Sequence, residues 1–297
     1  MLITITIHII NTMNENNTTM NNHSDITKHN ILTIQTVQIA PFRTLMTALK
    51  DILLETNITF TSEGIKIINM DKSHTILAHL VLNSQNFEKY ECKLDKIIIG
   101  VNMFHLFKLI NTIDNDDTLT IYIEKEDYAD GIVQYLGLRF DNGDIKQQKI
   151  QKLRLIEPEN EELSVPDVKF SSVLNLPSVD FQKIIRDLSC ISDKIEIKSI
   201  ATNNGAELIF KCGGGFAHAE IRRAESDGSM EFIKKQDINK IIQGEFSLKN
   251  LSYFIKCTNL CSQIEIYLEN DLPLVVKYNV ASLGEIKLCL APLPSSH

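Results

Sequence analysis

One helical pattern occurs twice in the chain, and this repeat constrains the fold more than any other feature of the sequence. Apolar residues at i, i+3, i+4 and i+7 mark one face of a helix, and the first such set is Phe42, Leu45, Met46 and Leu49. The set returns 139 positions later (181 − 42 = 139) as Phe181, Ile184, Ile185 and Leu188. A second helix and its following strand recur at an offset of 145 (267 − 122 = 145), with Leu106, Ile110, Tyr122 and Glu124 matched by Leu251, Ile255, Tyr267 and Glu269. The chain is therefore predicted to be an internal duplication.

Short alternating segments surround these helices and predict antiparallel strands. In the first copy, helices are expected over 41–50 and 102–113, and strands over 33–39, 58–61, 65–69, 75–82, 90–93, 118–124, 132–140 and 145–153. In the second copy, helices are expected after Pro177 and over 247–258, and strands over 169–176 and 263–269. The predicted class is α+β, with each of two duplicated domains carrying a sheet on one side and two helices on the other.

An extended connector is predicted between the two copies, over 155–168. Pro158 and Pro166 remove backbone donors, and its five carboxylates meet no cation within the segment, so neither a helix nor a central strand suits it. Leu163, Val165 and Val168 are nevertheless apolar, which predicts that the connector is held against a surface. The expected division is a disordered extension over 1–32, domain 1 over 33–154, the connector, and domain 2 over 169–297.

The N-terminal extension is rich in Asn, Thr and His and has too little apolar surface to fold alone. Its apolar start, 1–10, has no Lys or Arg before it and no small-residue cleavage pattern after it, which argues against a signal peptide. No run approaches the ~20 apolar residues of a membrane span. The six cysteines are dispersed and lack zinc-ligand spacing, so reduced thiols and no metal are expected.

The distribution of positive charge decides whether this acidic chain can bind nucleic acid. A net charge of -8 repels DNA unless the cations are segregated on one surface. The predicted helices carry Arg43, Lys50, Lys108, Lys183, Arg186, Lys249 and Lys256, and the stretches 41–50, 102–113, 181–186 and 247–258 contain no acidic residue. Seven residues span nearly two turns, so Arg43 and Lys50 share a helix face, as do Lys249 and Lys256. Segregation is favoured, and lysines decorating solvated helix faces remain the alternative.

Three stretches resemble sliding clamps of the PCNA type, the kind found in eukaryotes, archaea and large DNA viruses. They are Gly64-Ile65-Lys66-Ile67-Ile68-Asn69-Met70-Asp71-Lys72-Ser73-His74, then Asp180-Phe181 with Ile185-Arg186-Asp187-Leu188-Ser189, and Leu272-Pro273-Leu274-Val275-Val276-Lys277-Tyr278 continuing to Leu290-Ala291-Pro292. The similarity covers about 33–293. It implies a ring of three subunits with strands outside and helices lining a central hole.

The resemblance also implies a function and a set of site residues. A clamp of this kind is a processivity factor that encircles duplex DNA without reading its sequence. It tethers DNA polymerase and other replication and repair proteins, is placed by a clamp loader, and acts in the nucleus or at the site of viral DNA replication. The implied DNA-facing cations are the seven named above. The implied partner-peptide pocket consists of Met70, Leu77, Leu163, Val165, Pro273, Ala291 and Pro292.

Two other classes of function compete with a homotrimeric clamp. Enzyme chemistry could use only His74 beside Asp71 and Ser73, or the glycine run 213–215, which lacks the ending of a phosphate loop, so no enzymatic activity and no cofactor are expected. The other class is a clamp-like subunit of a heterotrimeric checkpoint clamp, or a monomeric viral processivity or transcription factor. The mass in solution distinguishes these alternatives. For a ring, the strand at 145–153 is expected to pair with one near 216–223 of the next subunit.

Overall fold

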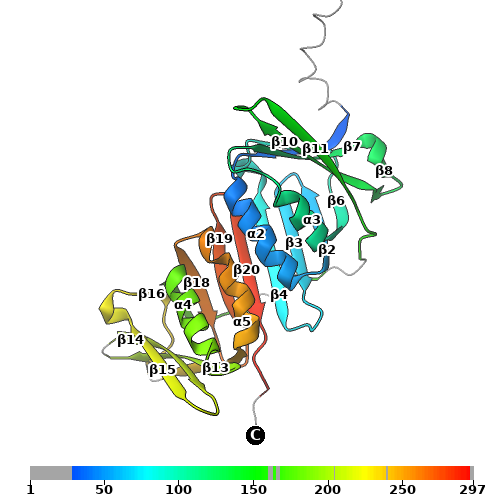
Figure 1. Cartoon of the computed structure of the whole chain (residues 1–297). Coiled ribbons are helices and arrows are strands. Elements are labelled where there is room, and N and C mark those ends of the chain that lie inside the picture. Colours follow the sequence, from blue (N-terminus) through cyan, green and yellow to red (C-terminus); the bar gives the residue numbers. More distant parts are fainter. Residues whose placement is uncertain (1–28, 160–162, 165–167, 204, 239, 295–297) are drawn as a thin grey trace, which may run out of the picture.

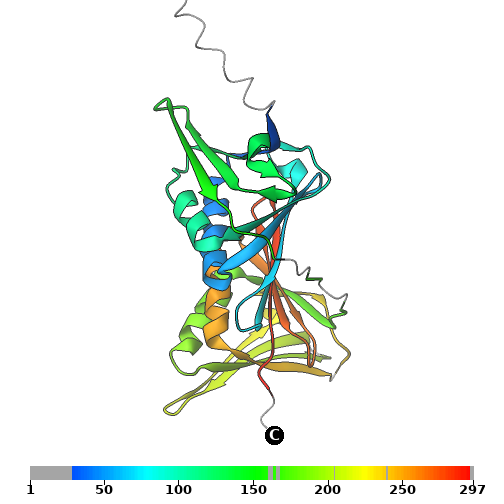
Figure 2. The same ribbon diagram turned by 90° about the vertical axis from the view of Figure 1, so that its right-hand side faces the viewer.

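The helices form one layer and the strands form another. The computed structural model describes residues 29–294, except 160–162, 165–167, 204 and 239. All labelled helices lie on the same side of the strands (Figures 1 and 2). They are α2 (Ile39–Ile52), α3 (Met103–Ile110), α4 (Ser178–Ser189) and α5 (Leu248–Phe254).

A nine-stranded antiparallel sheet runs through both halves of the chain. Its order is β16 (Glu231–Lys234), β12 (Ser172–Pro177), β18 (Gln263–Leu268), β19 (Leu274–Val280), β20 (Gly284–Leu290), β4 (Ile76–Asn83), β3 (Gly64–Met70), β2 (Glu55–Thr61) and β6 (Ile97–Asn102). The first five strands come from the second half of the chain and the last four from the first half. The pairing of β20 with β4 therefore joins the two halves.

Two smaller sheets belong to one half each. The first half forms a five-stranded sheet in the order β11 (Gln147–Arg154), β10 (Tyr135–Asn142), β7 (Thr118–Glu124), β1 (Asn30–Thr36) and β5 (Lys89–Cys92). The second half forms a four-stranded sheet in the order β15 (His218–Ala224), β14 (Gly205–Gly213), β13 (Lys194–Thr202) and β17 (Ile241–Ser247). A short hairpin of β8 (Tyr128–Ala129) and β9 (Ile132–Val133) completes the first half.

The predicted duplication is visible in the strand order. In the first half the order β11-β10-β7-β1-β5 places β1 between β5 and β7, and in the second half β20-β19-β18-β12-β16 places β12 between β16 and β18. The orders β4-β3-β2-β6 and β15-β14-β13-β17 match in the same way. All eight residues of the two repeated helix stripes are buried, as the periodicity predicted. Each half is thus one copy of the same two-layer unit.

Several element bounds differ from the sequence-based prediction. The strand 118–124 was correct, but β1 begins at Asn30, so residues 30–32 belong to the fold and not to the extension. The helix expected over 247–258 is α5 followed by a 3-10 helix, η5 (Ile255–Leu260). The strand β6 was missed because its sequence, IIIGVN, is a continuous apolar run without alternation. Within the described residues, no helix is long and apolar enough to cross a membrane.

Candidate functional site

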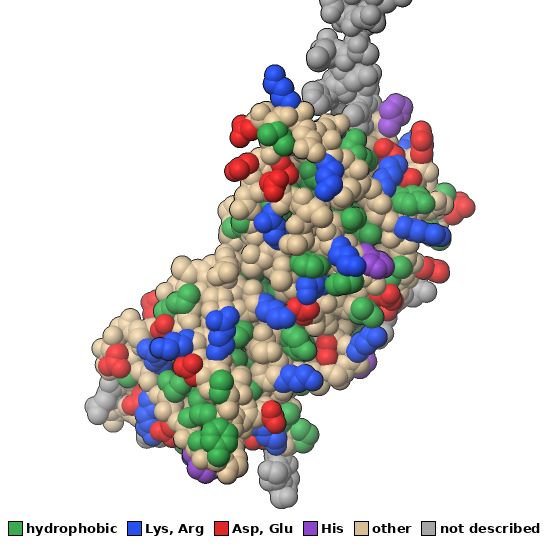
Figure 3. Space-filling view, viewed as in Figure 1, with side chains coloured by type: hydrophobic (Ala, Val, Ile, Leu, Met, Phe, Trp, Pro, Cys, Tyr) green, Lys and Arg blue, Asp and Glu red, His purple; other side chains and the backbone are tan. Residues whose placement is uncertain are grey.

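The helix layer gathers the predicted DNA-facing cations on one face of the molecule. Arg43 and Lys50 lie on α2, Lys108 on α3, Lys183 and Arg186 on α4, and the last two on α5 and η5. In the same view as Figure 1, Lys and Arg side chains outnumber Asp and Glu over the helices (Figure 3). The cations on the helices therefore share one surface of the molecule.

Arg43 is engaged within the protein. Its Nη2 donates a hydrogen bond to the carbonyl oxygen of Ile113, in the loop that follows α3. Its Nε is buried and has no hydrogen-bond partner among the described atoms. Arg43 thus ties α2 to the segment after α3, and its guanidinium is less available to an external phosphate than a solvated one.

Lys50 and Lys256 share one carboxylate. Lys50 Nζ donates to Asp51 Oδ1 at 2.7 Å, and Lys256 Nζ donates to Asp51 Oδ2. Partial burial favours the neutral carboxyl, but the hydrogen bonds and charges of Lys256 and Lys50 outweigh it and hold the pKa of Asp51 below its ordinary value of 3.8. The helix α2 extends beyond Lys50, the last residue predicted for it, and therefore includes an acidic residue that the prediction left out. The helix α4 likewise includes two acids, Asp180 and Asp187.

Aromatic rings lie beneath three of these lysines. Lys50 Nζ is 4.9 Å from the centre of the Phe107 ring, Lys108 Nζ is 4.5 Å from that of Phe104, and Lys256 Nζ is 5.4 Å from that of Tyr253. Such cation–π contacts restrict the directions in which an ammonium group can reach. By contrast, Lys183, Arg186 and Lys249 are exposed and form no ion pair with another described residue.

The predicted peptide pocket is built on the face of the sheet where the two halves join. Met70 on β3 pairs with Leu77 on β4, Leu77 pairs with Cys289 on β20, and Cys289 pairs with Val275 on β19. Directly paired residues point to the same face of a sheet, so these four form one apolar row. Burial raises the pKa of the Cys289 thiol to about 11, so the thiol stays neutral at pH 7.

A tight turn fixes the end of this row between β3 and β4. The carboxylate of Asp71 accepts hydrogen bonds from the backbone N–H groups of Ser73, Thr75 and Ile76 at 3.2, 2.8 and 2.6 Å. His74 adopts a positive φ of 55° inside the turn. The residues considered as candidate enzyme chemistry therefore form a structural turn, because the Asp71 carboxylate is occupied by backbone donors.

The remaining predicted pocket residues fall in different places. Ala291 donates its N–H to Thr75 O at 2.9 Å, and Pro292 follows it, so both lie beside the Asp71 turn. Pro273 directly precedes β19. Leu163 instead lines a hollow of about 750 Å³ beside β2, β3 and β6, which none of the other predicted pocket residues lines. Val165 lies outside the described residues.

The start of the connector is attached to β6 and β2, as the sequence predicted for an apolar-studded segment. Ile156 N donates to Gly100 O at 3.0 Å, and a Cβ on Gly100 would lie 2.6 Å from Ile156 O, so only glycine permits this approach. Asn57 holds Glu159 with two hydrogen bonds, Nδ2 to the carbonyl oxygen at 2.7 Å and backbone N to Oδ1 at 3.0 Å. The nine-stranded sheet, through β2 and β6, thus fixes residues 156–159.

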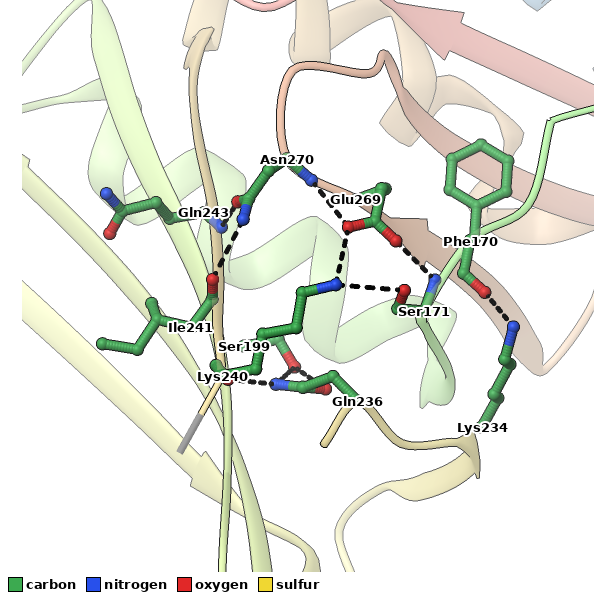
Figure 4. Close-up of polar contacts among 10 residues, drawn as sticks. All are labelled: Phe170, Ser171, Ser199, Lys234, Gln236, Lys240, Ile241, Gln243, Glu269 and Asn270. Carbon is green, nitrogen blue, oxygen red and sulfur yellow. Dashed lines mark hydrogen bonds and ion pairs between the residues drawn. The ribbon is translucent and has the colours of Figure 1, made fainter. Parts of the chain in front are cut away.

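The segment directly after the connector, residues 169–171, is attached at Glu269 (Figure 4). Glu269 accepts from Ser171 N at 2.9 Å and from Lys240 Nζ at 3.3 Å, and Lys234 Nζ donates to Phe170 O. Partial burial acts against the charge of Glu269, but the donors from Ser171, Asn270 and Lys240 outweigh it and lower the pKa of this carboxyl. The start of the connector and the residues directly after it are therefore held, the first by the first half of the chain and the second by the second half.

The cysteines are free thiols, namely Cys92, Cys190, Cys212, Cys257, Cys261 and Cys289. The structure groups no three His, Cys, Asp or Glu residues as metal ligands in the part of the chain that it describes. The candidate functional features of the protein are therefore surfaces, namely a basic helix face, an apolar row on the opposite side, and open strand edges.

Comparison with known proteins gives matches over both halves. Residues 31–162 match the family described as "Proliferating cell nuclear antigen, N-terminal domain", and residues 164–293 match "Proliferating cell nuclear antigen, C-terminal domain". The two matches meet at residue 163, inside the predicted connector.

Two viral proteins are similar along most of the chain. The "Probable DNA polymerase sliding clamp 1" of Paramecium bursaria Chlorella virus 1 is 30% identical over 262 residues, which are 88% of this chain and 97% of that protein. The "Probable DNA polymerase sliding clamp" of Acanthamoeba polyphaga mimivirus is 34% identical over 234 residues, 79% of this chain. The chain spans about half, 48%, of the length of that second relative.

Proposed function

The chain belongs to the proliferating cell nuclear antigen family, and we propose that it is a DNA sliding clamp, a ring that encircles duplex DNA and tethers DNA polymerase. The ring consists of three identical subunits. It works as a scaffold rather than as an enzyme, it is opened and closed on DNA by a clamp loader, and it acts wherever the DNA it serves is replicated, whether in a nucleus or at a site of viral DNA replication.

One observation supports a ring. The two strands that join the halves each have an equivalent strand elsewhere in the chain, and those equivalents do not pair with each other among the described residues of the subunit. Inside the chain, β20 pairs with β4 over seven residue pairs. The strand equivalent to β20 is β11 and the strand equivalent to β4 is β15, and within the part of the chain that the structure describes each stands at an open edge of its sheet. Open edges invite pairing, and pairing β11 with β15 of the next copy repeats the internal junction head to tail.

The internal junction also supplies a register. Starting from the repeated residues Tyr122 and Tyr267, two steps across the sheets lead to Lys152 on β11 and to Cys289 on β20, which lies opposite Leu77 on β4. The counterparts of β20 residues on β11 are therefore 137 positions earlier (289 − 152 = 137).

The same procedure aligns β4 with β15. Starting from Phe60 and Ser199, which are 139 positions apart, two steps lead to Leu82 on β4 and to Arg223 on β15. Leu82 lies opposite Gly284, whose counterpart is Gln147 (284 − 137 = 147). The predicted interface therefore places Gln147 opposite Arg223 and, one residue on, Gln148 opposite Arg222 of the next subunit.

Cysteine cross-linking tests both the ring and the register. Gln148→Cys with Arg222→Cys, in a Cys190→Ser background because Cys190 is an exposed thiol, is expected to give covalently closed trimers on mild oxidation. The matched control, Gln148→Cys with Glu220→Cys, is two residues out of register and is expected to cross-link far more slowly. A monomeric mass of the unmodified protein, or equal cross-linking of both pairs, contradicts the proposal. A monomeric mass would favour a monomeric processivity or transcription factor, and a trimer formed only with other chains a checkpoint-type clamp.

The basic helix face is proposed to contact the phosphates of duplex DNA. Its members, Arg43, Lys50, Lys108, Lys183, Arg186, Lys249 and Lys256, are suited to charge-to-phosphate contacts, which carry no sequence information and permit sliding. Affinity is therefore weak, sensitive to salt and independent of sequence, while topological linkage provides persistence on DNA.

The apolar row is proposed to dock partner peptides with an aliphatic and two aromatic anchors, together with Leu163, Val165, Pro273, Ala291 and Pro292. Leu77 is central to the row, so Leu77→Ser is expected to weaken peptide binding about tenfold, a loss of ~1.4 kcal/mol. Leu163→Ser is expected to weaken it as well. If Leu163 only packs the connector into its own hollow, calorimetry will give lower thermal stability with unchanged peptide affinity, and Leu163 leaves the proposed pocket.

A further inference from the structure

A shared carboxylate lies within the basic helix face. Asp51 on α2 accepts from Lys50, its neighbour in the first half, and from Lys256 on η5, which belongs to the second half, 205 residues away. The side chain of Asp51 is 25% exposed, that of Lys50 18% and that of Lys256 38%. A partly desolvated carboxylate with two cations is a stronger contact than an exposed surface pair.

Aromatic rings also restrain the two lysines that share Asp51. Lys50 lies over the Phe107 ring and Lys256 over the Tyr253 ring, at 4.9 and 5.4 Å. Each ammonium group thus contacts both a carboxylate oxygen and an aromatic face. A phosphate that binds either lysine must compete with Asp51, and the negative charge of Asp51 acts against every approaching phosphate.

We propose that Asp51 is a positioning residue that limits the phosphate affinity of Lys50 and Lys256 and so keeps the clamp mobile on DNA. This inference rests on the proposed function, because it assigns a role within the DNA-facing surface. Weak contact is an advantage for a ring that must slide, since every phosphate bond has to break at each step along the duplex. Because both lysines are held near an acid, each of them contributes less to DNA binding.

Asp51→Asn tests the role with little change in shape. With the charge removed, the two lysines are released toward phosphate, and the slope of log affinity against log salt is expected to become steeper by up to ~1.8, at ~0.9 per added contact. DNA affinity near physiological salt should rise severalfold, and one-dimensional diffusion of the loaded ring should slow by a similar factor. An unchanged or flatter slope overturns the proposal.

A control variant separates this local effect from a general change of charge. Asp187→Asn on α4 also adds one unit of positive charge to the helix layer, but Asp187 is exposed and forms no ion pair with a described residue. Its salt slope is expected to stay near that of the unmodified ring. Equal slopes in the two variants would show that only the overall field matters and would overturn the specific role of Asp51.

A double-mutant cycle gives a readout that a merely structural role would not move. If Asp51 acts through Lys256, the effect of Asp51→Asn on the salt slope must shrink in a Lys256→Met background. A structural role predicts instead a lower melting temperature with the same slope in both backgrounds. The proposed function fails in a different way, because then the unmodified protein gives no trimer and no salt-dependent DNA binding for any variant to alter.

Discussion

The two halves of the chain place cations on equivalent helices but use them differently. In the first half, Arg43 is bonded to Ile113 O, Lys50 to Asp51, and Lys108 lies over Phe104. In the second half, Lys183, Arg186 and Lys249 are exposed and form no ion pair with a described residue, and Lys256 alone of the four is engaged, by Asp51 and the Tyr253 ring. Duplication would suggest equal contributions, whereas the contacts predict that the second half provides most of the phosphate binding.

The two halves also differ in how the equivalent strands β20 and β11 are paired. Lys287 on β20 lies between two strands, opposite Lys277 on β19 and His79 on β4. Among the described residues its counterpart, Ile150 on β11 (287 − 137 = 150), pairs with Arg139 on β10 alone, and Ile150 is 55% exposed. One copy of the strand thus joins the two halves of the subunit, and the other is available for the pairing proposed between subunits.

The largest expected effect comes from placing proline in these two strands. Ile150→Pro removes a backbone donor at an open edge, so the ring is expected to dissociate while each subunit stays folded. Lys287→Pro interrupts a strand paired on both sides and is expected to prevent folding of the subunit. Sedimentation gives the assembly state and circular dichroism the fold. An Ile150→Pro protein that still sediments as a trimer would show that β11 is not the interface strand.

A smaller effect is expected from reversing charges on one half at a time. Lys183→Glu with Arg186→Glu should flatten the slope of log affinity against log salt by about 1.8, because two exposed contacts are lost at ~0.9 each. Lys50→Glu with Lys108→Glu changes the net charge equally but is expected to flatten it less, because those lysines are already engaged. Titrations of a short duplex at several salt concentrations check both. The trimer and peptide binding should be unchanged, and equal slopes would mean that the halves contribute alike.

The sequence predicted the repeated architecture because periodicity is a local property. The stripes on α2 and α4 and the alternation of β7 could be read from neighbouring residues, and the matched offsets indicated the duplication. The continuous apolar run of β6 could not be assigned in this way, since it shows neither a helical nor a strand period.

The partners of the site residues could not be predicted, because they lie far apart in the sequence. Arg43 and Ile113 are 70 residues apart, and Asp51 and Lys256 are 205 apart. Periodicity gives the helix face on which a lysine lies, but it does not identify the carboxylate that pairs with that lysine. The change from α5 to the 3-10 helix η5 was not predicted either, because the seven-residue spacing of Lys249 and Lys256 was interpreted with α-helical turns throughout.

The smallest expected effect compares Glu124 and Glu269, which occupy repeated positions. Glu124 accepts from Lys152 on the open-edge strand β11, and Lys152 also donates to Asp127 at 3.0 Å. Glu269 instead accepts from Ser171, just after the connector, and from Lys240. Glu269→Gln is expected to destabilise the subunit by about 1 kcal/mol at pH 7, and Glu124→Gln by less, because Lys152 keeps Asp127 as a partner.

The pH dependence of this difference follows from the lowered pKa of Glu269. Its carboxyl titrates below the ordinary value of 4.5 in the folded protein, so the unfolded chain takes up the proton first as the pH falls. The stabilisation is therefore complete above about pH 5 and is lost as the pH falls through the lowered folded pKa. Denaturant unfolding of the unmodified protein and Glu269→Gln should differ most near neutral pH and converge toward pH 3. A difference that stays constant down to that pH would mean that the shape of the Glu269 side chain, and not its charge, stabilises the contacts with Ser171 and Lys240.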